Sequence, residues 1–164
     1  MELTILEGKH YSKGRKIRLV RPSMGMRGSF QLDGNCWYDK SVYGSHINKV
    51  TGFSLDLFNR DSVRLGWRPS DQEGKFEILI YVHYKGRWVR SSKEVDDIIA
   101  IVGTSKNRFS IEFERGELVY DVNEEEKRIK IPFKRGIGWM MWFYFGGKVK
   151  SPQTMTMKVN YVIE

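Results

Sequence analysis

The sequence predicts an all-β protein, a single-domain antiparallel two-sheet sandwich of the jelly-roll type. The strongest indication is the run FEILIYVHY, residues 76–84, in which both alternating sets of side chains are largely apolar. Successive side chains of a strand point to opposite faces, so this strand is covered on both and lies in the interior of a layered structure. Many other short β-rich runs, separated by turn residues and with almost no helix between them, complete the pattern.

Individual strands follow from alternation and from turn residues. Residues 108–114 alternate cleanly, with Phe109, Ile111 and Phe113 on the inward face. Residues 138–145, GWMMWFYF, are apolar at both parities and predict a second inner strand. The other expected strands cover residues 2–6, 16–20, 29–32, 36–38, 49–57, 62–67, 88–89, 117–122, 127–133 and 154–163.

Residues 91–103, SSKEVDDIIAIVG, fit two structures. Val95, Ile98 and Val102 have helical spacing, and the segment opens with a capping-box pattern. Residues 98–102 are also rich in β-branched side chains, which favour strands. Because both neighbouring segments are strands, we favour a strand from Ile98.

Length and composition limit the organisation and the class of protein. The chain has 164 residues, which suits one domain over residues 1–164, with a basic N-terminal part, residues 1–28, packed onto it. The only cysteine, Cys36, excludes an intramolecular disulfide and is expected to be a small buried side chain. No signal peptide or membrane span is recognisable, so we expect synthesis in the cytoplasm, no membrane contact and, for a virion protein, release at lysis.

The sequence nominates no catalytic residue, metal site or cofactor. His10, His46 and His83 are far apart and lack metal-ligand spacing, and no nucleophile or phosphate-binding motif occurs. Glu112 and Glu114 share a strand face, as a glycosidase pair would, but the opposite face is the apolar one. We therefore interpret both carboxylates as solvated.

Aromatic and basic residues are the candidates for binding. An aromatic row can stack on sugar rings, with arginines donating hydrogen bonds, or can form a subunit interface. The expected binding residues are Arg64, Trp67, Arg68, Trp88, Trp139, Trp142 and Tyr144. Arg64 and Arg68 share a parity, and Lys49 or Asp56 is expected on the same surface.

The net charge of +8 and the basic stretch from Lys9 to Arg21 suggest an acidic partner surface. Few aromatics accompany this stretch, so non-specific nucleic-acid contact is the most that the pattern predicts for nucleic acid.

Three strings carry a resemblance to a known group: HINKVTGFS (46–54), DSVRLGWR (61–68) and FYFGGKVKSPQTMTMKV (143–159). Together they resemble uncharacterised jelly-roll proteins of Bacteroidetes and their phages, and more distantly the concanavalin A-like lectin and glucanase sandwiches. In that group a His-rich stretch lies between the first two strings. Here the stretch is LDLFNRD, residues 55–61, and Pro152-Gln153 replaces a Pro-His pair, so a histidine site does not transfer.

From these observations the primary hypothesis is a non-enzymatic binding protein, a phage virion structural or accessory component acting through protein contacts or self-association. The alternative is a lectin-like carbohydrate-binding module that stacks sugars on Trp88, Trp139, Trp142 and Tyr144. A polysaccharide-degrading glycosidase or lyase is the third interpretation.

Overall fold

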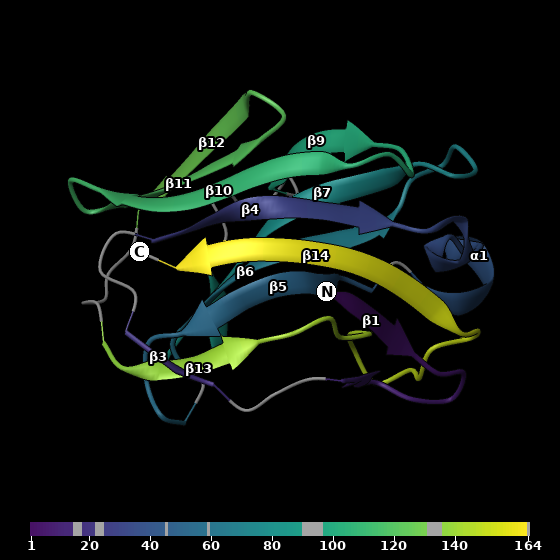
Figure 1. Ribbon diagram of the computed structural model, residues 1–164, viewed down its shortest axis with the longest axis horizontal. Helices are drawn as coiled ribbons and strands as arrows, with labels where there is room; N and C mark the ends of the chain where they lie inside the picture. Colours follow the sequence, from purple (N-terminus) through teal and green to yellow (C-terminus); the bar gives the residue numbers. More distant parts are fainter. Residues whose placement is uncertain are drawn as a thin grey trace.

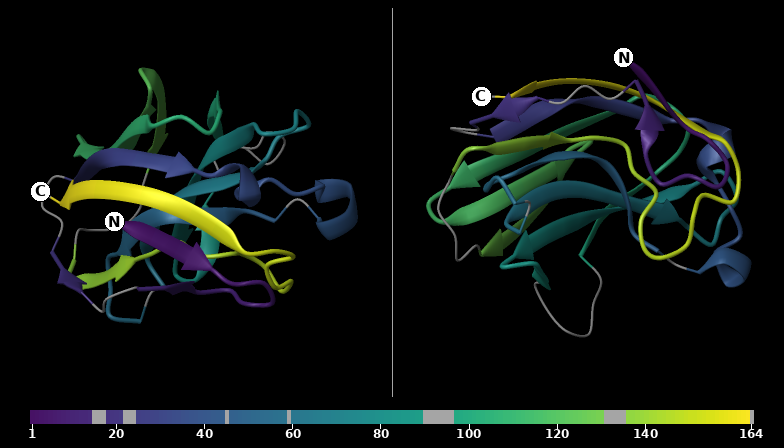
Figure 2. Two further views of the ribbon diagram at one scale, coloured as in Figure 1. Left: turned by 45° about the vertical axis from the view of Figure 1, so that its right-hand side comes forward. Right: turned by 90° about the horizontal axis from the view of Figure 1, so that it is seen from below.

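The computed structural model describes residues 1–14, 18–21, 25–44, 46–58, 60–89, 97–130 and 136–163. These residues form two antiparallel β-sheets packed face to face, which confirms the predicted sandwich (Figure 1). The layers are clearest in the right-hand view of Figure 2, where yellow β14 lies in one layer and the teal strands lie in the other.

Sheet A contains the N-terminal strands, the C-terminal strand and the hairpins from the second half of the chain. Its last strand pairs with β4 over seven residues, from Met157 opposite Leu32 to Ile163 opposite Met26. In spatial order the strands are β12 (Glu125–Lys130), β11 (Glu117–Val122), β10 (Asn107–Glu114), β4 (Gly25–Leu32), β14 (Met155–Ile163), β1 (Glu2–Ile5) and β2 (Ser12–Lys13).

Sheet B contains the strands from the middle of the chain. In spatial order they are β3 (Leu19–Val20), β13 (Gly138–Met141), β5 (Asn48–Ser54), β6 (Ser62–Pro69), β7 (Phe76–Tyr84) and β8 (Arg87–Val89), with β9 (Ile98–Val102) also paired to β7. Strand β7 therefore has β6 along one edge and β8 and β9 along the other, as expected for an interior strand. Ile98–Val102 is a strand, as favoured; residues 91–96 of that segment lie outside the described residues.

The core fills the space between the sheets. Val63, Leu65 and Trp67 of β6 point toward sheet A and are essentially unexposed, as are the alternate residues of β10. Phe53 of β5 contacts Phe113 of β10 across this space, with ring centroids 6.1 Å apart. The odd-numbered side chains of β6 thus form the inner face of sheet B, and its even-numbered side chains form the outer face.

Some local predictions were wrong. Residues 36–38 do not form a strand: a 3₁₀ turn (Gly34–Cys36) and a short helix α1 (Lys40–Tyr43) follow β4. The Asp39 carboxylate caps this helix by accepting from the Ser41 N–H, a local hydrogen bond that competes with pairing. Strand β13 ends at Met141 instead of continuing to residue 145.

Cys36 is buried, as expected, and burial raises the pKa of its thiol to about 12. Within the described ranges, no helix is both long and apolar enough to traverse a bilayer.

Candidate functional site

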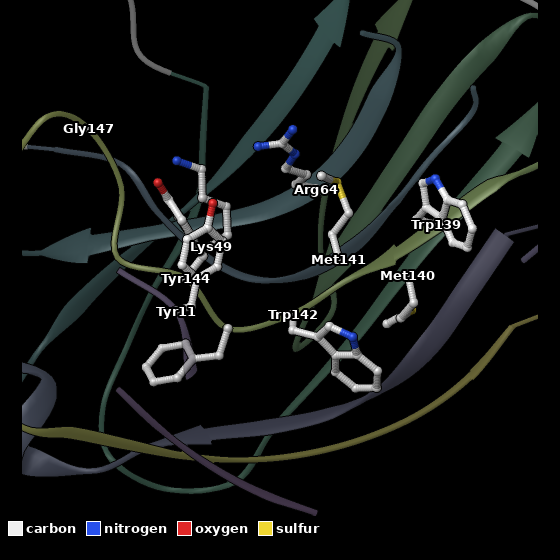
Figure 3. Close-up of a pocket in the computed structure, with 10 residues that line it drawn as sticks. Tyr11, Lys49, Arg64, Trp139, Met140, Met141, Trp142, Tyr144 and Gly147 are labelled. Atoms are coloured by element: carbon white, nitrogen blue, oxygen red, sulfur yellow. The ribbon is translucent and has the colours of Figure 1, made fainter. Parts of the chain in front are cut away.

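A pocket of about 440 Å³ opens on the outer face of sheet B, the face turned away from sheet A (Figure 3). This volume is in the range of small-ligand sites. Its polar side chains come from β5, β6 and the segments around β2 and after β13. The lining residues are Tyr11, Lys49, Arg64, Trp139, Met140, Met141, Trp142, Phe143, Tyr144 and Gly147.

A β-bulge places Lys49 in this pocket. The pairing of β5 with β6 shifts between Lys49 and Thr51, so Val50 is an extra residue in the ladder. Val50 is buried in the core together with Phe53, whereas Lys49 lies opposite Gly66 on the outer face. Without the bulge, strict alternation from Phe53 would turn Lys49 inward.

The Lys49 amine is enclosed although its side chain carries a charge. Its Nζ donates to the Ile47 carbonyl at 3.0 Å and lies 4.6 Å from the ring centroid of Tyr81 and 5.1 Å from that of Tyr144. A Cβ atom at Gly146 would collide with the backbone carbonyl oxygen of Ile47 and lie 2.6 Å from Nζ, so glycine is needed there. The residue is 5% exposed.

Arg64 is the second cation of the pocket. It lies between Gly52 of β5 and Tyr81 of β7 in the sheet, and its guanidinium carbon is 5.6 Å from the Tyr81 ring centroid. Its Nε is buried and has no hydrogen-bond acceptor among the described residues. Neither Lys49 nor Arg64 forms an ion pair within the described part of the chain.

Burial and mutual repulsion shift the protonation of these bases. Burial, with the Arg64 charge as a second cause, lowers the pKa of the Lys49 amine to about 7. Burial, with the charges of Arg64 and Lys49, lowers the pKa of His83 to about 4, so this imidazole is neutral at neutral pH. Lys49 is therefore divided between its charged and neutral forms near pH 7.

Tyrosine hydroxyls surround the two cations. The backbone of Tyr144 forms isolated antiparallel β-bridges with Lys49 and with Tyr11. The rings of Tyr11 and Tyr144 pack edge to face, with their centroids 5.0 Å apart. Figure 3 shows both hydroxyls on the same side of the sheet as the Lys49 amine. Burial raises the pKa of Tyr81 and of Tyr144, so both phenols stay protonated and available as donors.

The donor set limits the chemistry. No Asp or Glu side chain lines the pocket among the residues the structure describes, and these residues include no cluster of three metal-ligating side chains. A buried lysine and a half-buried arginine with phenolic donors and no carboxylate suit an anionic ligand, whose charge offsets the repulsion between the two cations.

Four of the expected binding residues line this pocket: Arg64, Trp139, Trp142 and Tyr144. Trp139 lies on β13, and its backbone N–H donates to the Ser54 hydroxyl at 2.5 Å. Trp88 lies next to the pocket on β8, opposite His83 in the sheet, with its ring centroid 5.5 Å from that of Tyr81.

Two expected residues, Trp67 and Arg68, lie elsewhere, and Trp142 meets the pocket only at its border. Trp67 is 0% exposed on the inner face of β6, where it packs against Phe76 and Phe143, so it offers no surface to a ligand. Arg68 lies toward the far end of β6, where its Nε donates to the Glu77 carboxylate at 2.5 Å. Trp142 borders the pocket but points away from Arg64 in Figure 3 and packs edge to face on Tyr161 of sheet A.

Sequence reasoning left Tyr11, Tyr81 and Met141 out of the site, and it included Lys49 only as an alternative to Asp56. Tyr81 was recognisable, because it is the polar-tipped residue on the second face of the most apolar strand. Trp142 and Tyr144 have the same parity, but the end of β13 at Met141 breaks the alternation, so Tyr144 lies on the outer side and Trp142 does not.

No protein-family model matches the chain, and no curated protein matches it in sequence. Several solved structures match in fold. An alginate lyase from Alteromonas sp. 272 has a TM-score of 0.58 at 7% identity, covering 99% of this chain and 87% of the lyase. A glycosidic hydrolase has a TM-score of 0.56 at 12% identity, covering 98% and 75%. A marine alginate lyase from Zobellia galactanivorans has a TM-score of 0.54 at 9% identity, covering 100% and 65%.

These likenesses show that the fold is the concanavalin A-like jelly-roll sandwich, as the sequence predicted. They also correct the primary functional hypothesis. The three solved structures named above are two alginate lyases and a glycosidic hydrolase, and the hypothesis of a phage virion component does not fit them. They link the chain neither to Bacteroidetes nor to phages.

Proposed function

We propose that the protein binds an acidic polysaccharide through the pocket on the outer face of sheet B. The observation that carries this proposal is a buried lysine, Lys49, beside a half-buried arginine, Arg64, set among tyrosines without a carboxylate in the described lining. A uronate residue supplies a carboxylate for the cations, hydroxyls for the phenols and an apolar ring face for the aromatic side chains. The fold neighbours that act on alginate support the same class of ligand.

Titration of intrinsic tryptophan fluorescence tests the proposal, because Trp139 lines the pocket and Trp88 lies beside it. Alginate and polygalacturonate are the acidic probes, and dextran of matched length is the neutral control. We expect a saturable signal with an acidic polymer, weakened by added salt, and none with dextran. A response to dextran alone would overturn the assignment to acidic ligands.

The affinity should depend on pH through Lys49. Its pKa is about 7 in the free protein, and a bound carboxylate raises that pKa, so binding takes up a proton above pH 7. We therefore expect affinity to be greatest below pH 7 and to fall as pH rises from 7 to 9. Titrations at several pH values measure this dependence.

Lys49→Met is the matched control for the pH dependence. It removes the titrating amine while keeping a flexible side chain of similar length. It should bind more weakly at pH 6 and with little change between pH 6 and 9. An unchanged pH profile in this variant would assign the dependence to another group.

Cleavage by β-elimination is a second candidate, favoured by the near-neutral pKa of Lys49 beside protonated Tyr144. Arg64 would neutralise the uronate carboxylate, which acidifies the proton on the adjacent C5. The Lys49 amine takes that proton, a C4–C5 double bond forms, the bond from C4 to the glycosidic oxygen breaks, and a tyrosine hydroxyl protonates that oxygen. Hydrolysis by paired carboxylates has no support in the described lining.

The product distinguishes cleavage from binding. Elimination creates a conjugated unsaturated uronate, which absorbs in the ultraviolet, whereas hydrolysis releases reducing ends without that absorbance. We expect absorbance to grow with time on an acidic polymer and to be lost in Lys49→Met. Saturable binding without any new absorbance would restrict the protein to recognition.

A further inference from the structure

Hydrogen bonds to one carboxylate order the described part of the segment that joins β5 to β6, next to the pocket. The Asp56 carboxylate accepts hydrogen bonds from the backbone N–H groups of Phe58, Arg60 and Asp61, at 2.8, 3.0 and 3.1 Å. The Leu55 N–H donates to the Asp61 carbonyl at 2.7 Å and closes the segment at its base. A single carboxylate thus orders the backbone, as in other Asx-stabilised turns.

This order keeps large apolar side chains in solvent. Leu57 is 54% exposed and Phe58 is 77% exposed, the most exposed of the large hydrophobic side chains in the described residues. The Arg60 guanidinium lies 5.4 Å from the centre of the Phe58 ring. A preformed aromatic face with a cation beside it contributes nothing to the core, and exposed patches of this kind mark binding surfaces.

The segment is continuous with the pocket through Trp139. The Trp139 indole Nε1 donates to the Leu57 carbonyl at 3.0 Å, and the backbone at Gly136 is packed so closely on the Leu55 carbonyl that a side chain would not fit. Leu19, 56% exposed, lies opposite Trp139 in the sheet. In Figure 1 the end of β5 lies beside β3 and β13. We call Leu19, Leu57, Phe58 and Trp139 the apolar shelf.

We propose that the apolar shelf is a further subsite for the same acidic polymer, binding sugar rings that extend beyond the cationic pocket. This inference rests on the proposed function. Trp139 faces both regions, so a chain with one uronate at Arg64 continues over the indole toward Phe58. There the ring face of a sugar meets the aromatic side chain, and its carboxylate meets Arg60. The shelf therefore gives preference for long chains over short ones.

Chain-length dependence in Phe58→Ala tests this subsite. Alginate oligosaccharides of two and of eight residues are the probes, and Val162→Ala is the control because Val162 is 58% exposed on sheet A. We expect wild type and the control to bind the octamer more tightly than the dimer. Phe58→Ala should lose about 3- to 10-fold in affinity for the octamer, the value of one aromatic contact, and nothing for the dimer.

The outcomes separate this inference from the proposed function. If wild type binds no acidic oligosaccharide, both fail. If it binds both lengths equally, or if Phe58→Ala keeps full affinity for the octamer, the subsite fails while the pocket stands. Light scattering without sugar measures whether the protein dimerises. If wild type is a dimer and Phe58→Ala is a monomer, the shelf is an interface with a second copy of the chain, and the proposed subsite is overturned.

Discussion

Arg64→Gln is expected to lower the affinity for alginate by about 10- to 100-fold, the value of a charge-assisted contact in a buried site. Arg64 is the fixed charge of the pocket, because Lys49 is partly neutral near pH 7. Glutamine keeps polar hydrogen-bonding groups but removes the charge that offsets the uronate carboxylate. The fold should be retained, since the substitution relieves the repulsion between the half-buried Arg64 and the buried Lys49.

Fluorescence titration at constant ionic strength measures this loss. Arg108→Gln is the matched control, because Arg108 is exposed on sheet A and is paired with Glu124. It removes the same net charge at a distance from the pocket, so it should change affinity little. Equal losses in the two variants would mean that net charge, and not the pocket, attracts the polymer.

Trp67→Ala is expected to lower the free energy of unfolding by about 3–5 kcal/mol, the usual cost of truncating a large core aromatic. The Trp67 indole is fully buried and packs against Phe76, Phe143 and Tyr38, with ring centroids 5.6, 6.1 and 6.4 Å away. The cavity left by alanine would lie between the sheets, where the surrounding strands cannot close around it.

Urea unfolding compares this variant with Trp139→Ala, a tryptophan of the pocket. Trp139→Ala should unfold close to wild type and bind alginate weakly, whereas Trp67→Phe, which leaves a smaller cavity, should be less stable than wild type and bind normally. The Phe variant keeps the test informative if Trp67→Ala does not fold. A reversal of these two phenotypes would place Trp67 in the binding surface after all.

The sandwich could be predicted from the sequence because burial repeats along each strand. The run at residues 76–84, which is apolar on both faces, predicted an interior strand. The alternation of residues 108–114 predicted a strand with one face in the core and the other toward solvent. Both are observed. Arg64 could be nominated for the same reason, since its parity opposite Val63 and Leu65 places it on the outer face.

The composition of the pocket was less predictable, since it depends on departures from alternation. Trp67 resembled a binding residue because two arginines flank it, but its own parity places it in the core. Trp142 and Tyr144 share a parity in sequence, yet the early end of β13 turns them to different sides. The exposure of Leu57 and Phe58 in the shelf could not be predicted, because apolar side chains are usually buried and the hydrogen bonds that Asp56 accepts become visible only in the structure.

The bulge at Val50 means that the second cation of the pocket depends on how β5 pairs as well as on the identity of residue 49. The same residues paired without a bulge would turn Lys49 into the sheet interior, whereas a strand that lacked Val50 would pair regularly and keep Lys49 opposite Gly66 on the outer face. A relative that is one residue shorter here could therefore keep the second cation. An alignment that allows no gap at Val50 would miss its lysine.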